Sequence, residues 1–430
     1  MLGEEIHNCA KKLWPICRSI TGSGVRSTLA ILKEKFPDIV VKEVPSGTTC
    51  LDWTIPKEWN IRDAYVIDPS GKKIIDFQKS NLHVVGYSIP IDAVVTLDEL
   101  QSHLYSSPEQ PEAIPYVTSY YKERWGFCIS DVQRKALTPG SYRVRIDSDL
   151  KDGNLTYGEA VIPGDSTQEV FISTYICHPS MANNELSGPV VTTFLARWLK
   201  SLPRRRYTYR IVFIPETIGS IAYLSKHVKW LQEHVVAGFN VSCVGDDRAY
   251  SYLPSRKGGT LSDIVARHVL KSIDPSYISY SWSDRGSDER QYCAPGIDLP
   301  IASIMRTKYG AFPEYHTSLD DLTHVVTTQG LEGGYNALRL ACEAIENNFY
   351  PKVTVLGEPQ LGKRGLYPTL SAKTSGNEVR VMMDLITWSD GEHCLIDIAE
   401  KCNVPVWDLY PIVEKLRQHG LLSLETSTAR

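Results

Sequence analysis

Polar side chains of a few types recur at one kind of place in the second half of the chain: after apolar, β-branched runs. The residues concerned are His178, Asn184, Glu185, Glu216, Asp246 and His316. Apolar runs of this kind predict buried strands, and in open α/β sheets ligands bind beyond the carboxyl ends of the strands. Imidazole nitrogen and carboxylate oxygen are ligands of catalytic zinc, which keeps one position open for water. We therefore predict that these side chains meet in one metal-binding crevice.

Each of these residues also has an ordinary structural explanation. His178 and His316 can be packed loop residues. Glu216 can be favoured by the dipole of a helix N-terminus, and Asp246 can order a turn. We prefer the metal site, because the structural explanation would have to hold at four separate strand ends.

The elements that must position these groups alternate between strand and helix from residue 168 to residue 350. Strands are predicted at 170–176, 209–214, 238–244 and 299–305, and helices at 189–202, 220–235, 261–273 and 329–347. This alternation predicts a mostly parallel α/β sheet covered on both faces.

The segments before residue 168 have two different patterns. Residues 3–36 predict two helices around a Gly/Ser turn, whereas the short alternating runs that follow predict a β-rich module over about 48–165. The aromatic residues of this module either form its core or offer a platform for a sugar or peptide ring. They are Trp53, Trp59, Tyr65, Tyr116, Tyr120, Tyr121, Trp125 and Phe127.

The C-terminal part combines a Pro- and Gly-containing linker, 353–375, with three predicted helices and a hairpin start over 376–430. This order of elements is typical of a winged helix. Residues 377–430 carry five basic and nine acidic side chains, whereas a DNA-binding module normally has a basic face. We therefore predict a dimerisation or protein-contact module and no nucleic-acid partner.

The composition is that of an ordinary globular chain. It has 430 residues and a net charge of −4, which does not favour nucleic acid or an anionic membrane as a partner. No apolar run reaches the roughly 18–20 residues of a membrane span, and residues 1–20 lack the pattern of a signal peptide. The ten cysteines include no CxxC pair, which favours reduced thiols. We expect a cytoplasmic protein.

The order of the polar groups resembles that of the co-catalytic zinc aminopeptidases. In that family a His near a strand end precedes an Asp before a Ser-Gly turn, a Glu-Glu-x-Gly motif, another Asp and a late Tyr-His-Thr. By position, the matching segments are His178, Asn184-Glu185-Leu186-Ser187-Gly188, Glu216-Thr217-Ile218-Gly219, Asp246 and Tyr315-His316-Thr317. The resemblance covers residues 168–350 and implies a zinc-binding α/β domain.

Nearly the whole chain also resembles a bacterial family of aminopeptidase-like proteins that is often associated with polysaccharide biosynthesis. The match is carried by residues 52–60, 215–220 and 286–291. It implies an aminopeptidase-like α/β domain with an inserted β-rich domain and a C-terminal winged helix. The implied boundaries are 1–47 with 166–352 for the α/β domain, 48–165 for the insert, 353–375 for the linker and 376–430 for the winged helix.

Two positions depart from the pattern of active zinc aminopeptidases. The Asp that bridges two metal ions falls on Asn184, and the second Glu falls on Thr217. An amide and a hydroxyl are weaker ligands than carboxylates, so we expect one zinc ion; a second requires Glu185 to replace the missing carboxylate. The strong ligands that remain are His178, Asp246 and His316.

The same resemblance implies the roles of the other groups. Glu216 keeps the position of the general base, which takes a proton from water and returns it to the leaving amine. Arg290 and Arg306 are candidates for binding a substrate carboxylate, although a surface or structural role is favoured over this one for each, and Tyr315 is a further substrate-binding candidate. We predict a metal-dependent amide hydrolase acting on a short peptide or an acylated amino sugar. The alternative is an aminopeptidase fold that has lost its activity and serves as a binding or assembly protein.

Other nucleophiles find less support. Ser187 lies before Gly188, but no Gly-x-Ser-x-Gly elbow is present. Cys177 is adjacent to His178, and neighbours on a strand point to opposite faces, so we expect Cys177 to face the core.

Overall fold

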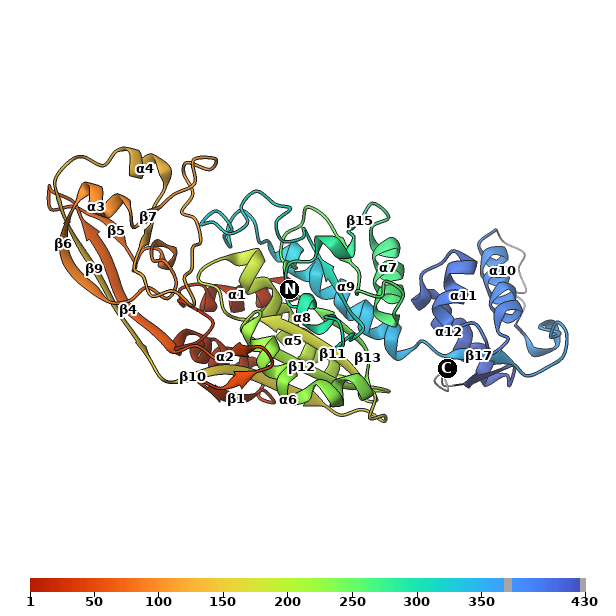
Figure 1. Cartoon of the computed structure of the whole chain (residues 1–430). Helices are drawn as coiled ribbons and strands as arrows, with labels where there is room; N and C mark the ends of the chain where they lie inside the picture. The colour runs from red at the N-terminus through yellow and green to blue at the C-terminus, as the bar shows by residue number, and fades with distance from the viewer. Residues whose placement is uncertain (367–372, 426–430) are drawn as a thin grey trace. The chain divides into compact units, whose positions relative to one another are not determined.

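The computed structural model of the protein describes residues 1–366 and 373–425 (Figure 1). It contains two compact units. The first consists of Met1–Ser262 and Ile278–Asn336, and the second of Asp263–Tyr277 with the described residues from Ala337 onward. Among the described residues, none of the helices combines the length and the apolar character needed to cross a bilayer.

The first unit is built on an eight-stranded sheet in the order β1-β10-β12-β11-β13-β16-β14-β15. The strands are β1 (Val40–Pro45), β10 (Asn154–Ile162), β12 (Thr208–Ile214), β11 (Glu169–Tyr175), β13 (Val235–Asn240), β16 (Ile301–Met305), β14 (Ser251–Leu253) and β15 (Ile278–Ser279). β12, β11, β13 and β16 run parallel, whereas β1, β10 and β14 make antiparallel pairs. The sheet is therefore mixed, with parallel strands at its centre, and not mostly parallel as the alternating pattern predicted.

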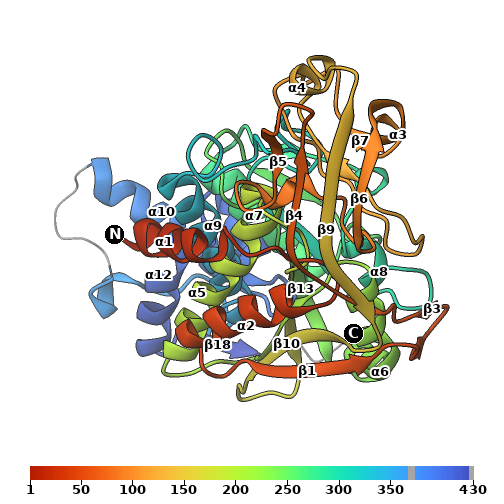
Figure 2. The same ribbon diagram turned by 90° about the vertical axis from the view of Figure 1, so that its left-hand side faces the viewer.

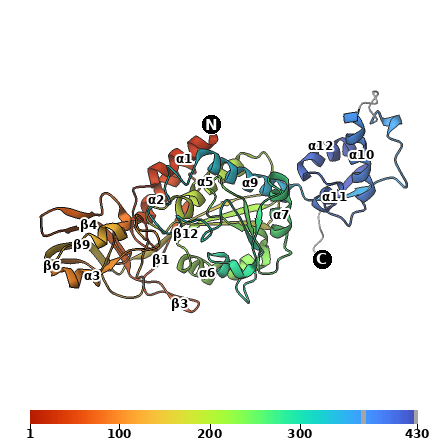
Figure 3. The ribbon, with the colours of Figure 1, turned by 90° about the horizontal axis from the view of Figure 1, so that it is seen from above.

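Helices cover both faces of this sheet. They are α1 (Leu2–Leu13), α2 (Ser23–Lys35), α5 (Ser187–Ser201), α6 (Ile218–His234), α8 (Glu289–Tyr292) and the first half of α9 (Thr328–Glu346), whereas nearly all of α7 (Leu261–Ile273) belongs to the second unit. α5 packs against β11, α1 and α2, and Figure 3 shows α1 and α5 on one side of the strands and α6 on the other. All seven residues of β11 are buried, as expected for a central strand covered on both faces.

A second, four-stranded antiparallel sheet occupies much of the segment predicted to be β-rich. Its strand order is β5-β4-β9-β6, and Figure 2 shows these four strands side by side. The strands are β4 (Glu58–Ile67), β5 (Lys73–Asp76), β6 (Ile91–Thr96) and β9 (Ser141–Lys151), with the short elements β2 (Thr49–Cys50), β3 (Trp53–Thr54), α3 (Leu97–Gln101), β7 (Leu104–Tyr105), β8 (Phe127–Cys128) and α4 (Asp131–Lys135) around them. Phe127, Val144 and Ile146 are in its core.

One strand of the predicted β-rich module belongs elsewhere. β10 was assigned to the module, but it pairs with β1 and β12 of the large sheet. β10 follows β9 after a short connection, but the two strands do not pair with each other: β9 pairs with β4 and β6, so the chain passes from one sheet into the other between them. Strand alternation alone cannot tell which sheet a strand joins.

The second unit contains a three-helix array and a two-stranded ladder. Its elements are α10 (Lys373–Trp388), α11 (Leu395–Cys402), α12 (Val406–Gln418), β17 (Tyr350–Val353) and β18 (Leu422–Glu425). β17 and β18 pair antiparallel, which gives the predicted winged-helix order. Parts of the predicted linker and tail, 367–372 and 426–430, lie outside the described residues.

Candidate functional site

The loop that follows β11 carries the first group of site residues. β11 ends at Tyr175, and the turn Ala182–Leu186, a π-helix, leads directly into α5. Asp320 fixes this turn, because its two carboxylate oxygens accept hydrogen bonds from the backbone N–H groups of Asn183 and Asn184 at 2.7 and 2.9 Å. Single-turn π-helical segments are frequent at functional sites.

His178 is held by two buried charged groups. Its Nδ1 lies 3.0 Å from Glu185 Oε2, and Arg18 Nε lies 3.2 Å from the other oxygen of Glu185. Arg18 Nε also donates a hydrogen bond to the carbonyl of His178 at 2.9 Å. Burial alone would lower the pKa of His178, but Cys177 and the Glu185 carboxylate raise it well above its ordinary value. Since Nδ1 is engaged by Glu185, Nε2 is the nitrogen that faces the site.

Glu216 lies opposite this nitrogen. Glu216 Oε2 is 3.7 Å from His178 Nε2, and Ser287 Oγ donates a 2.6 Å hydrogen bond to Glu216 Oε1. Burial raises the pKa of Glu216. One oxygen of Glu216 is therefore fixed by a hydroxyl, while the other faces the imidazole.

The turn that presents Glu216 is strained. Thr217 has φ 63° and ψ −76°, and Ile218 N–H donates to the carbonyl of Glu216 at 2.8 Å, which together define a γ-turn of the rare, positive-φ form. Asp288 Oδ1 accepts hydrogen bonds from the Thr217 N–H and the Ser220 hydroxyl, each at 2.7 Å. Burial, with a contribution from Glu216, raises the pKa of Asp288 to about 8.

Strain of this kind recurs around the site. Thr217, Cys243 and His316 all have positive φ, at 63°, 52° and 59°. Such conformations cost on the order of 1–3 kcal/mol each and persist where the surrounding structure enforces them, often at functional sites. They give the site a backbone geometry that ordinary loops do not adopt.

Asp246 is fully engaged by other protein groups. Its Oδ1 accepts from the Thr307 hydroxyl at 2.6 Å and from Arg248 N–H at 3.0 Å, and its Oδ2 accepts from Asn183 Nδ2 and Thr307 N–H, both at 2.9 Å. A carboxylate offers about four acceptor positions. Asp246 in this arrangement therefore joins three loops and presents no free lone pair.

His316 lies among aromatic rings. Its ring centroid is 5.8 Å from that of His178, and Tyr315 stacks on it at 3.8 Å. Tyr116 from the β-rich segment lies edge-on to both imidazoles, with centroid distances of 5.3 and 5.2 Å. The backbone N–H of Tyr116 donates a hydrogen bond to the His316 carbonyl at 2.8 Å. Burial and the nearby His178 lower the pKa of His316 to about 3, so its imidazole is neutral.

The other predicted site residues have more varied surroundings. Asn184 Oδ1 accepts from Tyr175 OH at 3.1 Å, while its Nδ2 is buried and has no hydrogen-bond partner among the residues that the structure describes. Arg290 is exposed and donates to Thr217 Oγ1 at 3.2 Å. Arg306 is buried with its guanidinium 3.9 Å from the centre of the Tyr250 ring, which is a structural environment.

The surroundings of Cys177 differ in part from those predicted. It is buried in the core as expected, yet its Sγ lies 3.4 Å from His178 Nδ1 and accepts from Glu216 N–H at 3.1 Å. The opposite-face argument is wrong here because Cys177 lies beyond Tyr175, where β11 ends. Burial raises the pKa of the Cys177 thiol to about 11, so it is not an activated nucleophile.

Arg18, Asp288 and Asp320 had no predicted role in the site, and Tyr116 was predicted only as one of the aromatic residues of the β-rich module. Arg18 is far from the predicted ligands in sequence and Asp320 follows His316 by four residues, but no pattern around either residue indicates its place. Only the segment 286–290 offered a signal, because its polar residues precede the last strand of the predicted sheet.

The residues fit a metal ion in part. Within the described part of the chain, Cys177, His178 and Glu185 have ligand atoms within 4.8 Å of one another, but the guanidinium of Arg18 against Glu185 disfavours a cation on that side. On the other side, His178 Nε2 and the neutral His316 imidazole have the ligand chemistry of zinc. A third ligand from Asp246 requires that it give up hydrogen bonds.

Comparisons with known proteins agree with this fold. Residues 7–348 match the family described as a domain of unknown function, DUF4910, and residues 348–424 match a winged helix-turn-helix family. A Clostridium acetobutylicum protein, provisionally named a polysaccharide biosynthesis protein with aminopeptidase-like domain, is 44% identical over 98% of this chain and 96% of its own length.

Comparison with solved structures shows the same fold. A crystal structure from Clostridium acetobutylicum, provisionally named a peptidase, superposes with a TM-score of 0.93 at 41% identity, covering 99% of this chain and 97% of that one. BSAP, a zinc aminopeptidase from Bacillus subtilis, superposes with a TM-score of 0.55 at 12% identity over 80% of this chain and 94% of that one; this likeness shows the fold alone. The chain therefore belongs to the DUF4910 family, with an aminopeptidase-like α/β fold and a C-terminal winged-helix domain.

Proposed function

We propose that the protein is a metal-dependent hydrolase of amide bonds in which Glu216 is the general base. The observation that carries the proposal is the placement of Glu216, 3.7 Å from His178 Nε2 and held by Ser287 on a strained γ-turn. A protein with no chemistry to perform has little reason to keep such a turn. The aminopeptidase-like fold of this chain and its relatives supports the same class of reaction.

His178 and His316 are the residues that would hold the metal, with Asp246 as the third ligand implied by the zinc aminopeptidase pattern. When bound, zinc supplies Lewis acidity, which polarises the substrate carbonyl and lowers the pKa of water. The neutral state of His316 suits this role, since a ligand imidazole must be deprotonated, whereas His178, whose pKa is raised by Cys177 and Glu185, would have to release its Nε2 proton when the metal binds. Glu185 and Arg18 orient His178 from behind, as carboxylates commonly orient histidine ligands.

Glu216 moves the proton in this mechanism. Its raised pKa makes the carboxylate a stronger base than an exposed glutamate. Oε2 is the free oxygen and accepts the proton of the attacking water, while Ser287 keeps the side chain in place through Oε1. The same oxygen then delivers the proton to the leaving amine nitrogen.

We infer a small substrate, because Tyr116 and Tyr315 close around the two imidazoles. A short peptide or an acylated amino sugar satisfies this limit and presents the required amide bond. The second class agrees with the polysaccharide biosynthesis name of the Clostridium relative.

The proposal is tested with Glu216→Gln. This change keeps the size of the side chain but removes the base, so turnover of aminoacyl p-nitroanilides or N-acetylated amino sugars should fall by about 10²–10⁴-fold while metal content is unchanged. Glu43→Gln is the matched control, because Glu43 is exposed on the edge strand β1. Wild-type turnover that survives in Glu216→Gln would show that Glu216 is not the base.

A second function is favoured by a specific observation. Asn184 and Thr217 replace two carboxylates of the co-catalytic pattern, and all four acceptor positions of Asp246 are used within the protein. These features suit a binding or assembly protein built on an enzyme fold. Failure of the wild-type chain to bind zinc at all would favour this function over the hydrolase.

A further inference from the structure

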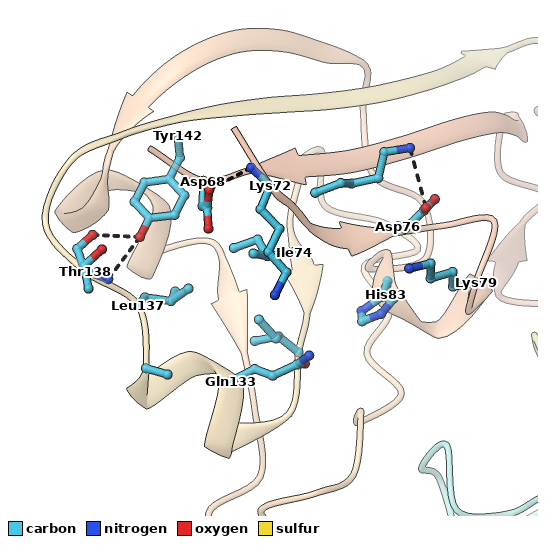
Figure 4. Close-up of a pocket in the computed structure, with 13 residues that line it drawn as sticks. Asp68, Lys72, Ile74, Asp76, Lys79, His83, Gln133, Leu137, Thr138 and Tyr142 are labelled. Atoms are coloured by element: carbon cyan, nitrogen blue, oxygen red, sulfur yellow. Dashed lines mark hydrogen bonds and ion pairs between the residues drawn. The ribbon is translucent and has the colours of Figure 1, made fainter. Parts of the chain in front are cut away.

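A cavity lies in the four-stranded sheet region, among residues 68–142. It has a volume of about 400 Å³, which lies in the range of roughly 300–1,000 Å³ typical of small-molecule sites. Its walls come from β5, the 3₁₀ turn Asn81–His83, α4 and the start of β9 (Figure 4). None of the residues assigned to the amide hydrolase lines it, so it is a separate site.

Three lysines and two aspartates line this cavity, which leaves one net positive charge, and two of the lysines have no direct partner in the described residues. Lys72 and Lys79 line it, and within the described residues neither ammonium group has an ion pair or a hydrogen bond. By contrast, Lys73 Nζ pairs with Asp76 at 3.5 Å. Figure 4 shows the side chain of Lys72 extending along the cavity and Lys79 next to His83. The free ammonium groups suit an anionic ligand.

The acidic side chain nearest to Lys72 is already satisfied. Asp68 Oδ1 accepts three hydrogen bonds, from the N–H and hydroxyl of Ser70 and from the N–H of Lys72, at 2.9, 2.6 and 2.9 Å. These bonds stabilise the turn before β5 and lower the pKa of Asp68. Asp68 therefore acts as a turn residue and does not pair directly with the Lys72 ammonium.

His83 adds a hydrogen-bond acceptor to the cavity. Its Nδ1 lies 2.8 Å from the carbonyl of Cys128, and since a carbonyl only accepts, Nδ1 must carry the proton. Burial lowers the pKa of His83, so the ring is neutral and Nε2 has a free lone pair. Nε2 has no hydrogen-bond partner in the described part of the chain, and it suits a ligand hydroxyl as donor.

The remaining walls combine apolar surface with one polar side chain. Ile74, Ile129 and Leu137 line the cavity together with the ring of Tyr142. The Tyr142 hydroxyl is fixed by the backbone of Thr138, donating to its carbonyl at 2.7 Å and accepting from its N–H at 3.2 Å. Gln133 Oε1 accepts from Ser130, which leaves its Nε2 hydrogens available as donors.

We propose that this cavity binds a small organic anion that carries hydroxyl groups, namely a phosphorylated sugar or a sugar acid. Lys72 and Lys79 contact the anionic group, His83 Nε2 accepts a ligand hydroxyl, and the apolar wall lies against the carbon skeleton. This combination of cations, an imidazole acceptor and an apolar face distinguishes such a ligand from a bare inorganic anion. The site is independent of the proposed hydrolase and of any metal.

The test is isothermal titration calorimetry of the full chain with glucose 6-phosphate and glucuronate, with glucose and inorganic phosphate as comparison ligands. At least one of the two anionic sugars should bind wild-type protein, and it should bind at least about tenfold more tightly than glucose or phosphate. Lys72→Met/Lys79→Met should weaken that binding by about tenfold or more, and Lys72→Arg/Lys79→Arg should restore most of it. Lys135→Met is the matched control, because Lys135 is an exposed lysine of α4 outside the cavity.

Three results would overturn the proposal. The first is that neither anionic sugar binds wild-type protein at millimolar concentration. The second is that the double methionine variant, with an unchanged melting temperature, binds like wild type. The third is that phosphate binds as tightly as the anionic sugar with the higher affinity, which would leave no role for the hydroxyl groups. Both lysines are exposed, so the variants are expected to fold.

Discussion

The buried group that determines the orientation of His178 is Arg18, which lies between α1 and α2 and far from the site in sequence. Its side chain and that of Glu185 are both fully buried. Arg18 binds the carbonyl of His178 through Nε and that of Leu13 through Nη1. One guanidinium thus connects the first helix, the loop after β11 and the carboxylate that orients the imidazole.

Replacing Arg18 should therefore be strongly destabilising. Arg18→Met leaves the Glu185 carboxylate buried without its cation, and breaking a buried pair in this way costs about 3–5 kcal/mol. The measurement is the free energy of unfolding from urea titration. Arg197→Met is the control, since Arg197 pairs with Glu5 at the surface, where such pairs contribute about 0–1 kcal/mol. Equal small losses in both variants would show that Arg18 does not neutralise Glu185.

Sequence reasoning predicted some of the residues that the structure brings together here. It identified His178, Glu216 and His316 because each follows an apolar run or lies in a characteristic short motif. It missed Arg18 and Asp320 because their roles depend on which loops meet in space. The role of Asp246 as a ligand stays a prediction, and sequence does not reveal that Thr307, Arg248 and Asn183 donate hydrogen bonds to its oxygens.

At the scale of elements, one ion pair joins three of them. Glu58 on β4 binds both terminal nitrogens of the Arg26 guanidinium on α2, at 3.1 and 2.6 Å, and accepts from Asn154 N–H on β10 at 3.0 Å. The Arg26 hydrogen bonds lower the pKa of Glu58 to about 2. Glu58 thereby couples the four-stranded sheet to the large sheet and its covering helix.

The Glu58–Arg26 ion pair should make the free energy of unfolding depend on pH in the acid range. Because the folded-state pKa of Glu58 lies below its unfolded value, its contribution is complete above about pH 4.5 and is lost as pH falls towards 2. Glu58→Gln should lower the free energy of unfolding by about 1–2 kcal/mol at pH 7. The difference from wild type should shrink below pH 4.5 in urea titrations at several pH values. A difference that stays constant down to pH 2.5 would contradict the assignment.

Most helices and strands were predictable, because the apolar residues of each recur with the spacing typical of a helix or a strand. α7 has the predicted bounds, and β11, β12, α5, α6 and α9 lie within two residues of theirs. β13 begins and ends earlier than the predicted 238–244, and the π-helical turn was not predicted at all. The sheet order could not be derived from periodicity, since the antiparallel pairing of β14 with β16 depends on tertiary contacts.

At the scale of the whole molecule, the winged-helix elements belong to a unit that also contains part of α7. His268 on α7 lies 2.6 Å from Glu400 through Nδ1 and accepts from Val406 N–H through Nε2 at 2.9 Å. These bonds fix the beginning of α12 against α7. We propose that this unit is a protein-contact module, because acidic residues outnumber basic ones in the sequence from 377 onward.

The full chain should therefore fail to bind duplex DNA. Fluorescence anisotropy with a labelled duplex at physiological salt should give a Kd no tighter than about 10⁻⁴ M, the weak end of non-specific binding. Micromolar binding that weakens steeply as salt is raised would mean that the winged helix binds DNA despite its charge.

The central claim, a metal-dependent site built around His178, is tested most directly by the zinc content of the purified protein. Elemental analysis should follow purification without chelator and without a nickel column. The measurement compares wild type with His178→Ala and with His324→Ala, an exposed histidine that pairs with Asp321. We predict about one zinc ion per chain in wild type and His324→Ala, as in catalytic sites with one open position, and almost none in His178→Ala. Wild-type protein that holds no zinc even after incubation with the metal would contradict the claim.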